Sequence, residues 1–370
     1  MNELMTAPAV FAVGNEYQIM VMTKSDLVFW VTVGEKNYYD HSNGILRSST
    51  RIHRVNVPMS ALDSAKEYTV NYRKIIDRKP YFPELEDVES KNYSFFPLDF
   101  SKPINMYHIA DAHGDAIFTT AAASYFGNDL HLLILNGDIP NHSGDIENFN
   151  LIYELSDRLT HGNIPCVFSR GNHDTRGFFA ENIAEYTPTR NGSSYFSFRL
   201  GKIWGLVLDT GEDKPDTNAE YGGTICCHAF REEETAYIES VIENADKEYN
   251  AEGVEYRFVI SHTPFAYTKE SPFDIEQDTY KYWLKLLKEN VKPQLMISGH
   301  LHKLAVSHIG GEYDSKGQVC PVVIASKPVR PNKIMSEYTG GAFTLENDCM
   351  TVLFTDNNKE VVYSENIILK

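Results

Sequence analysis

Apolar and polar side chains alternate at every second position in the first part of the chain. Residues 17–21, 29–33 and 68–72 show this pattern, and turn-forming residues such as those at 42–44 separate the stretches. A period of two places successive side chains on opposite faces of a β-strand, and several short strands at this spacing are typical of a β-sandwich. The pattern therefore predicts an all-β domain over residues 1–98.

From residue 104 onward, continuous apolar runs alternate with stretches that have the helical period. Such runs are typical of strands that are covered on both faces, and their alternation with helices indicates an α/β order. Apolar stretches after residue 320 indicate closing β-strands. We therefore expect a second domain over residues 99–370. The expected strands and their following residues lie at 104–110, 130–138, 164–172, 202–210, 256–265 and 294–302, with helices near 230–247 and 278–289.

The spacing of Leu62 and Tyr68 resembles the tyrosine corner of fibronectin type III domains, because Tyr68 opens an alternating strand six residues after the leucine. This resemblance implies an immunoglobulin-like or fibronectin-III-like fold for residues 1–98. The segment at 81–100, which has mixed charge, is expected to end this domain and to lead into the next one.

Polar residues that metals prefer follow five of the apolar runs directly. Ligands of α/β sheets bind at the carboxyl ends of the strands, so these residues are expected to meet at one edge of the sheet. Each group alone has an ordinary explanation, such as a turn for a Gly-Asp or a core position for a histidine. Together, in this order, they indicate a common cause. The groups are Asp111-Ala112-His113, Gly137-Asp138, Gly171-Asn172-His173-Asp174, His262 and Gly299-His300-Leu301-His302.

Carboxylate oxygens and imidazole nitrogens suit Zn²⁺, Mn²⁺ and Fe²⁺, and no cysteine belongs to these groups. Seven candidate ligands are too many for one tetrahedral zinc ion. They suit two divalent ions that share a bridging carboxylate, an arrangement that holds a phosphoryl group and activates water for in-line attack. The residue types therefore predict a two-metal site for Mn, Zn or Fe.

The ordered series Asp-x-His, Gly-Asp, Gly-Asn-His-Asp, His and Gly-His-x-His resembles the motif set of the calcineurin-like metallophosphoesterase superfamily over residues 104–370. The resemblance implies a β-sandwich flanked by helices, in the layer order αββα, and a dinuclear-metal-dependent hydrolase of phosphate esters. In the implied mechanism a metal-bridging hydroxide attacks phosphorus and His173 assists the leaving group. Phosphomonoesters and phosphodiesters both remain open as substrates.

The resemblance also implies how the ligands divide between the two ions, with Asp138 as the bridge. An ordinary turn residue is the alternative for Asp138, and a surface histidine is the alternative for His113. The first ion is expected to bind Asp111, His113, Asp138 and His302, and the second Asp138, Asn172, His262 and His300.

Four further residues are implied to act on the substrate. His173 would bind a phosphoryl oxygen or protonate the leaving alkoxide, and Asp174 would hold its ring in the required tautomer. The alternative for Asp174 is a cap of the helix that follows. Arg176 could pair with a phosphate oxygen, or be a solvated loop arginine. His142 could reach the substrate, or be an ordinary loop histidine.

A β-sandwich in front of such a domain resembles the architecture of plant purple acid phosphatases. Those enzymes have a glycine where this chain has His113. They also have an iron-binding tyrosine three residues after the bridging aspartate, where this chain has Asn141. Without that tyrosine there is little reason to hold Fe³⁺, so divalent ions are expected.

The amino-acid composition restricts the classes of substrate and partner that are expected. The chain has 51 Asp+Glu and 34 Lys+Arg, a formal charge of −17, and such a surface repels nucleic acid and anionic membranes. A phosphorylated small molecule or protein is therefore the expected substrate. Five cysteines without a C-x-x-C spacing favour a reducing compartment. No leader and no long apolar run is present in the sequence, so a cytoplasmic location is expected.

The segment at 211–230 is rich in glycine and has no regular period. Long irregular loops are often functional, so it is expected to form a rim or lid beside the site, with a plain surface excursion as the alternative. A different class of function is also open: a catalytically silent scaffold or binding protein with the phosphoesterase fold. The complete set of ligands together with His173 favours the enzyme.

Overall fold

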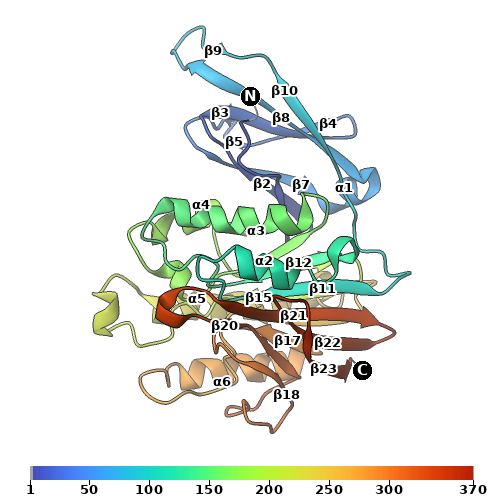
Figure 1. The fold of residues 1–370 in the computed structure, drawn as a ribbon, viewed down its shortest axis with the longest axis vertical. Coiled ribbons are helices and arrows are strands. Elements are labelled where there is room, and N and C mark those ends of the chain that lie inside the picture. Colours follow the sequence, from blue (N-terminus) through green and yellow to red (C-terminus); the bar gives the residue numbers. More distant parts are fainter. Residues whose placement is uncertain (1–2, 370) are drawn as a thin grey trace.

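The computed structural model describes residues 3–369. The N-terminal part of the chain, at the top of Figure 1, forms an all-β unit. Two sheets face one another there and enclose apolar side chains such as Ile19, Val31 and Val70. This arrangement confirms the predicted β-sandwich. The first sheet contains β1 (Ala9–Val13), β2 (Glu16–Met22) and β7 (Ile52–Pro58). The second contains β10 (Glu89–Ser94), β8 (Glu67–Asp77), β3 (Leu27–Val33) and β4 (Lys36–Tyr39), with β9 (Glu84–Leu85) beside β8. The short elements are β5 (His41–Ser42), β6 (Ile45–Leu46) and α1 (Met59–Ala65).

The first of these sheets continues into the sheet of the second unit. Strand β1 pairs in parallel with β13 (Cys166–Ser169), where Phe11 lies opposite Cys166. The combined sheet has ten strands in the order β23-β22-β21-β11-β12-β13-β1-β2-β7, with β20 beside β21. The division into domains at residues 98 and 99 stays a prediction, and paired strands cross it.

Tyr68 also joins the two parts of the chain. Its side chain is buried, and its hydroxyl donates a hydrogen bond to the carbonyl of Gly162 at 2.9 Å. A tyrosine corner bonds instead to backbone a few residues upstream in its own domain. The prediction of a tyrosine corner is therefore wrong, because the nearest acceptor for the buried hydroxyl comes from the second unit.

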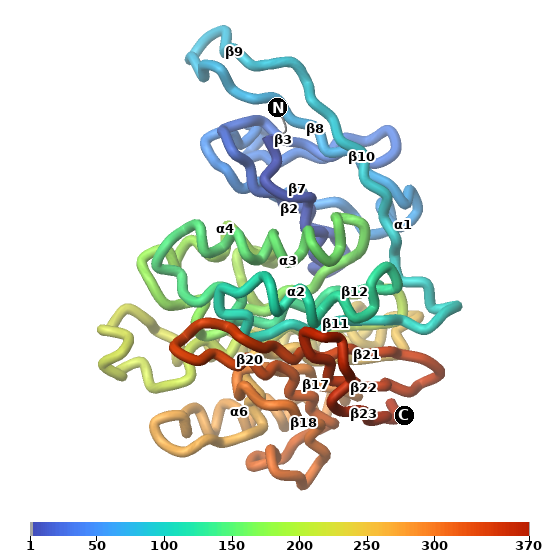
Figure 2. The backbone as a smooth tube through the Cα atoms, viewed as in Figure 1, coloured from blue at the N-terminus to red at the C-terminus, as the bar shows by residue number. Residues whose placement is uncertain are grey.

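A second sheet, of six strands, faces the combined sheet, and apolar side chains of both fill the space between them. Helices α2 and α3 cover the outer face of the combined sheet, while α5 and α6 cover the outer face of the second (Figures 1 and 2). This confirms the predicted order αββα.

The remaining strands of the combined sheet are β11 (Ile104–Ile109), β12 (Leu132–Asn136), β20 (Lys327–Val329), β21 (Glu337–Glu346), β22 (Cys349–Asp356) and β23 (Val361–Ile368). The second sheet, in its spatial order, contains β14 (Phe196–Leu200), β15 (Ile203–Leu208), β16 (Tyr256–Ser261), β17 (Leu295–Ser298), β19 (Val322–Ala325) and β18 (Leu304–Ser307). The helices are α2 (Ile117–Ala123), α3 (Asn150–Thr160), α4 (Ile183–Tyr186), α5 (Cys227–Glu243) and α6 (Gln277–Leu286).

Strand β12 shows why the apolar runs are continuous. Leu132 and Ile134 face the core between the two sheets, whereas Leu133 and Leu135 pack under the helices. Because successive side chains of a strand point to opposite faces, a strand covered on both sides does not need a polar residue at every second position. The run therefore ends only where the strand ends, which is where the candidate ligands begin.

The helices are all shorter than a bilayer requires. In the part of the chain from residue 3 to 369, no helix has the length and apolar character needed to cross a membrane. The longest, α5, has 17 residues, among them the buried charged residues Arg231 and Glu234.

Candidate active site

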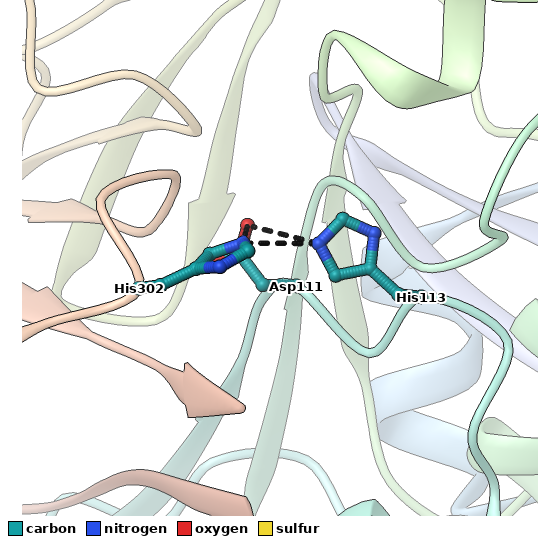
Figure 3. A group of neighbouring side chains, drawn as sticks. All are labelled: Asp111, His113 and His302. Carbon is teal, nitrogen blue, oxygen red and sulfur yellow. Dashed lines mark hydrogen bonds and ion pairs between the residues drawn. The ribbon is translucent and has the colours of Figure 1, made fainter. Parts of the chain in front are cut away.

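The candidate ligands follow the carboxyl ends of strands from both sheets, so the site lies at the edge where the two sheets meet. Strands β11, β12 and β13 of the combined sheet and β16 and β17 of the second sheet supply them. Figure 3 shows three of these side chains converging from different segments. The structure brings together all seven residues predicted as ligands: Asp111, His113, Asp138, Asn172, His262, His300 and His302.

Two clusters of donor atoms contain predicted ligands only, and a third group, His113, Asp138 and His173, shares a residue with each of them. In the first, Asp111 Oδ1 lies 3.3 Å from His302 Nε2, and His113 Nε2 lies 3.0 Å from the same His302 atom (Figure 3). In the second, Asp138 Oδ2 lies 3.3 Å from His262 Nε2. Asn172 Oδ1 and His300 Nδ1 are 3.0 Å apart and belong to that second side of the site.

The backbone of the site is strained. Five of the seven ligand residues have a positive φ, a conformation that costs a residue with a side chain about 1–3 kcal/mol. Strain of this kind persists where the surrounding structure imposes a required geometry. The values are 54° at Asp111, 47° at His113, 53° at Asp138, 66° at His300 and 51° at His302.

Three buried atoms of the predicted ligands, Asp111 Oδ1, His113 Nδ1 and His262 Nε2, have no hydrogen-bond partner among the described residues. Asp111 Oδ2 accepts from the Ser326 hydroxyl and from the His300 amide at 2.8 Å, which leaves its Oδ1 free and pointing into the first cluster. His262 Nδ1 bonds to the Asn136 carbonyl at 2.7 Å, which leaves its Nε2 without a hydrogen bond. Buried polar atoms are normally paired, so Asp111 Oδ1 and His262 Nε2 fit a cation.

Ser326 and Asn136 were not predicted as site residues, and they hold the ligands in place. Ser326 directly follows β19, so the rule that located the other strand ends would have found it. Asn136 ends β12, and its side-chain amide also donates to the Ile297 carbonyl at 3.2 Å across the two sheets. That contact depends on how the sheets face each other, and no local pattern signals it.

Burial and charge act in opposite directions on the acidic ligands. Burial alone would raise the pKa of Asp138, but the charge of His262 outweighs it and holds the pKa below its ordinary value. The same balance, with His262 and His302 opposing burial, keeps the pKa of Asp111 well below normal. Both carboxylates are therefore ionised and ready to bind a cation at neutral pH.

Metal affinity is expected to depend on pH, because the His262 ring must lose a proton before it can bind a cation. Burial lowers the pKa of His262, but Asp138 and Asp111 outweigh it and raise the pKa to about 10. Burial lowers the pKa of His113 to about 4, so that ring is already neutral at pH 7. An incoming cation must displace the His262 proton, and we expect the apparent association constant for Mn²⁺ to rise about tenfold per pH unit from pH 7 to 9. Calorimetric titrations at three pH values measure the slope, and an affinity that is flat or falls with pH would contradict it.

His173 is held by the backbone. Its Nδ1 lies 3.0 Å from the carbonyl oxygen of Asn141, and its ring packs edge-on against that of His113, with centroids 4.7 Å apart. An Nδ1–H that donates to this carbonyl leaves Nε2 to carry out proton transfer. The contact that fixes the ring thus comes from the backbone of Asn141.

Asp174 is not in contact with the His173 ring. Its Oδ2 accepts hydrogen bonds from the amides of Gly171 at 2.8 Å and Asp138 at 3.2 Å. Burial, and next the charge of Asp138, raise the pKa of Asp174 well above its ordinary value. The carboxyl group therefore ties the β12 and β13 loops together. Gly171 has no room for a side chain, because a Cβ there would lie 2.3 Å from Asp138 Oδ1.

Arg176 forms ion pairs with acidic residues. It forms a two-pronged ion pair with Glu212, at 2.7 Å for both Nε–Oε1 and Nη2–Oε2, and a contact with Glu220 at 3.1 Å. Its Nη1 lies 3.4 Å from His173 Nε2, so the guanidinium is beside the site. His142 is exposed, and its ring accepts from the amide of Gly144 at 3.0 Å within its own loop, away from the ligands.

The pair between Arg176 and Glu212 gives a stability prediction. The Glu212 side chain is fully buried, so removing the arginine leaves a buried carboxylate without its cation, and of the described residues only the Tyr221 and Thr175 hydroxyls still donate to it. We expect Arg176→Met to lower the free energy of unfolding by about 3 kcal/mol, and the double variant with Glu212→Gln to recover part of that loss. Urea denaturation of the three proteins measures both. Unchanged stability of Arg176→Met, together with a raised KM for phosphate esters, would show instead that Arg176 binds the substrate.

The segment at 211–230 lies beside the second cluster. Asp213 Oδ2 is 3.5 Å from His300 Nε2, and Lys269 Nζ approaches the same nitrogen to 2.9 Å. The segment is pinned by Arg176 through Glu212, and it includes a short helical turn at Ala219–Tyr221. Its placement agrees with a rim of the site, and its role as a lid stays a prediction.

An αββα sandwich with clusters of aspartate and histidine at its strand ends defines the class of metal-dependent phosphoesterases. Residues 104–304 match the sequence model of calcineurin-like phosphoesterases, and the chain belongs to that family. It is therefore a metal-dependent hydrolase of phosphate esters.

Solved structures support the fold. A purple acid phosphatase, PPD1, from seeds of yellow lupin (Lupinus luteus) superposes with a TM-score of 0.59 at 11% identity, covering 98% of this chain and 74% of the other. PhoD superposes with a TM-score of 0.54 at 14% identity, covering 97% of this chain and 88% of the other. The similarity extends over the front β-sandwich as well. No curated protein sequence gives a significant match to the chain.

Proposed function

We propose that the chain hydrolyses phosphate esters with two divalent metal ions, Mn, Zn or Fe, bridged by Asp138. The observation that carries this proposal is the pair of buried atoms Asp111 Oδ1 and His262 Nε2, which form no hydrogen bond within residues 3–369 and are 3.7 Å apart among further ligand atoms. One ion would be held by Asp111, His113, Asp138 and His302, and the other by Asp138, Asn172, His262 and His300. Bound divalent ions polarise the phosphoryl group and lower the pKa of the attacking water.

The residues of the chain supply the proton transfer. His173 presents Nε2 to the leaving oxygen while Asn141 holds its Nδ1, and a positioned acid of this kind contributes ~10²–10⁴-fold to the rate. Asp174 acts through the backbone. Its hydrogen bonds to the amides of Gly171 and Asp138 hold His173 and the bridging carboxylate at fixed positions relative to each other. Its contribution is one of position rather than contact with the substrate.

The substrate is a phosphorylated small molecule or protein. The formal charge of −17 disfavours nucleic-acid polymers and anionic membranes, as does the set of buried acids at the site. A panel of p-nitrophenyl phosphate, bis-p-nitrophenyl phosphate and nucleotides, each with Mn²⁺, tests the proposal. Turnover of at least one ester supports it. Metal-loaded protein that hydrolyses none of them would indicate a scaffold with the same fold.

A further inference from the structure

Arg330 is a half-buried cation beside the predicted metal ligands. It directly follows β20, and its Nη2 donates a hydrogen bond to Asn141 Oδ1 at 2.9 Å. No carboxylate oxygen of residues 3–369 lies within 4.0 Å of its guanidinium nitrogens. Burial lowers the pKa of Arg330, and the acids that oppose this shift are Asp111 and Asp138, both of the site. The guanidinium thus faces the metal-binding carboxylates with most of its donors unused.

Three other arginines of the second unit, Arg170, Arg176 and Arg231, have acidic partners, whereas the half-buried Arg199 and Arg257 donate mainly to backbone carbonyls. Arg176 pairs with Glu212 at 2.7 Å, and Arg231 pairs with Glu276 at 3.1 Å. The chain has 51 acidic and 34 basic residues, so acidic partners are plentiful. A partly buried charge that keeps no counter-ion is costly unless a ligand supplies one. Arg330 is therefore a cation beside the predicted ligands whose counter-ion an incoming anion can supply.

Asn141 places Arg330 next to the proposed acid. The side chain of Asn141 accepts from Arg330, while its backbone carbonyl lies 3.0 Å from His173 Nδ1. The His173 ring in turn packs against His113, a predicted ligand of the first ion. One residue thus fixes both a proton donor and a cation on the same side of the site, where the phosphoryl group and its leaving oxygen must lie.

We propose that Arg330 binds the phosphoryl group of the substrate and makes the site favour phosphomonoesters over phosphodiesters. The proposal rests on the proposed function and names the substrate class. A monoester near neutral pH carries close to two negative charges over three terminal oxygens, and a diester carries one over two. The planar fork of an arginine binds two such oxygens at once, so it adds more to the binding of the monoester.

The experiment compares the full-length wild type with Arg330→Ala, Arg330→Lys and a control, Lys327→Ala. Lys327 is an exposed cation on β20, three residues from Arg330. For each protein, metal content, melting temperature and the calorimetric Kd for inorganic phosphate are measured at pH 8. The kcat/KM values for p-nitrophenyl phosphate and bis-p-nitrophenyl phosphate give the preference for the monoester.

Arg330→Ala is expected to weaken phosphate binding by about 10- to 100-fold and to lower the monoester-to-diester ratio by at least about tenfold, because charge-assisted hydrogen bonds are lost. Arg330→Lys keeps the charge but not the fork, so an intermediate loss is expected. Lys327→Ala should stay within about twofold of the wild type, as expected for an exposed surface charge.

The proposal is overturned if Arg330→Ala, with metal content and melting temperature unchanged, keeps both the phosphate affinity and the monoester preference of the wild type. An equal loss in Lys327→Ala would also overturn it, because the effect would then be one of general charge. A wild type that hydrolyses neither ester refutes the proposed function instead. In that case the calorimetric Kd values still decide whether Arg330 binds phosphate.

Discussion

Replacing Asp138 with asparagine is expected to lower kcat/KM for phosphate esters by at least ~10³-fold, because the bridge between the two ions loses its charge and metal stabilisation is worth several kcal/mol. Asparagine suits the site sterically: the backbone at Asp138 has a φ of 53°, a conformation that asparagine accepts more readily than most residues. The oxygen that accepts from the His173 amide at 2.8 Å can also be kept. We therefore expect the fold to survive while metal content falls.

Metal analysis, a melting curve and kcat/KM on the same sample test this expectation. Asp145→Asn is the matched control, since Asp145 is an exposed aspartate seven residues further along the chain. An Asp138→Asn protein that binds a full complement of metal and turns over like the wild type would show that Asp138 is not the bridge.

The second large effect is expected for His173→Ala. Its kcat should fall by ~10²–10⁴-fold, as for the loss of a general acid, while metal content is expected to stay unchanged because His173 is not among the predicted ligands. The loss should depend on the leaving group. An alkyl phosphate needs its leaving oxygen protonated, whereas p-nitrophenolate leaves without help. We expect the smaller loss for p-nitrophenyl phosphate and the larger for the alkyl ester.

Steady-state kinetics with both esters, on the wild type, His173→Ala and the control His41→Ala, measure this difference. His41 is an exposed histidine of the two-stranded sheet β5-β6 in the N-terminal unit, far from the predicted ligands in the sequence. An equal loss for the two esters, or a loss of metal in His173→Ala, would assign His173 a structural or ligand role rather than that of the acid.

The predicted ligands could be identified from the sequence because each group directly follows an apolar run of neighbouring residues. A strand buried on both faces is an unbroken apolar run, and the first polar residues after it, such as Asp111 or His300, must lie at the strand end. The same rule reaches Ser326, which follows β19. The chemistry of these residue types then points to metals without any knowledge of their distances.

The contacts that complete the site are long-range and have no such signal. Asn141 and Arg330 are 189 residues apart and meet only because β20 and the closing strands return to the combined sheet. The ion pair of Arg176 with Glu212 and the hydrogen bond from the Asp138 amide to Asp174 likewise join segments that are far apart in the sequence. The pairing of β1 with β13 uses backbone groups, which every residue carries, so no side-chain pattern announces it.

The most direct test of the dinuclear site is a titration of metal-free protein with Mn²⁺, in which bound ions and hydrolysis of p-nitrophenyl phosphate or bis-p-nitrophenyl phosphate are measured together. The two clusters of ligand atoms, with Asp138 as the proposed bridge, predict that activity is absent without metal and reaches its maximum when two ions are bound per chain. Activity that persists in the metal-free protein, or that is complete with one ion bound, would contradict the account.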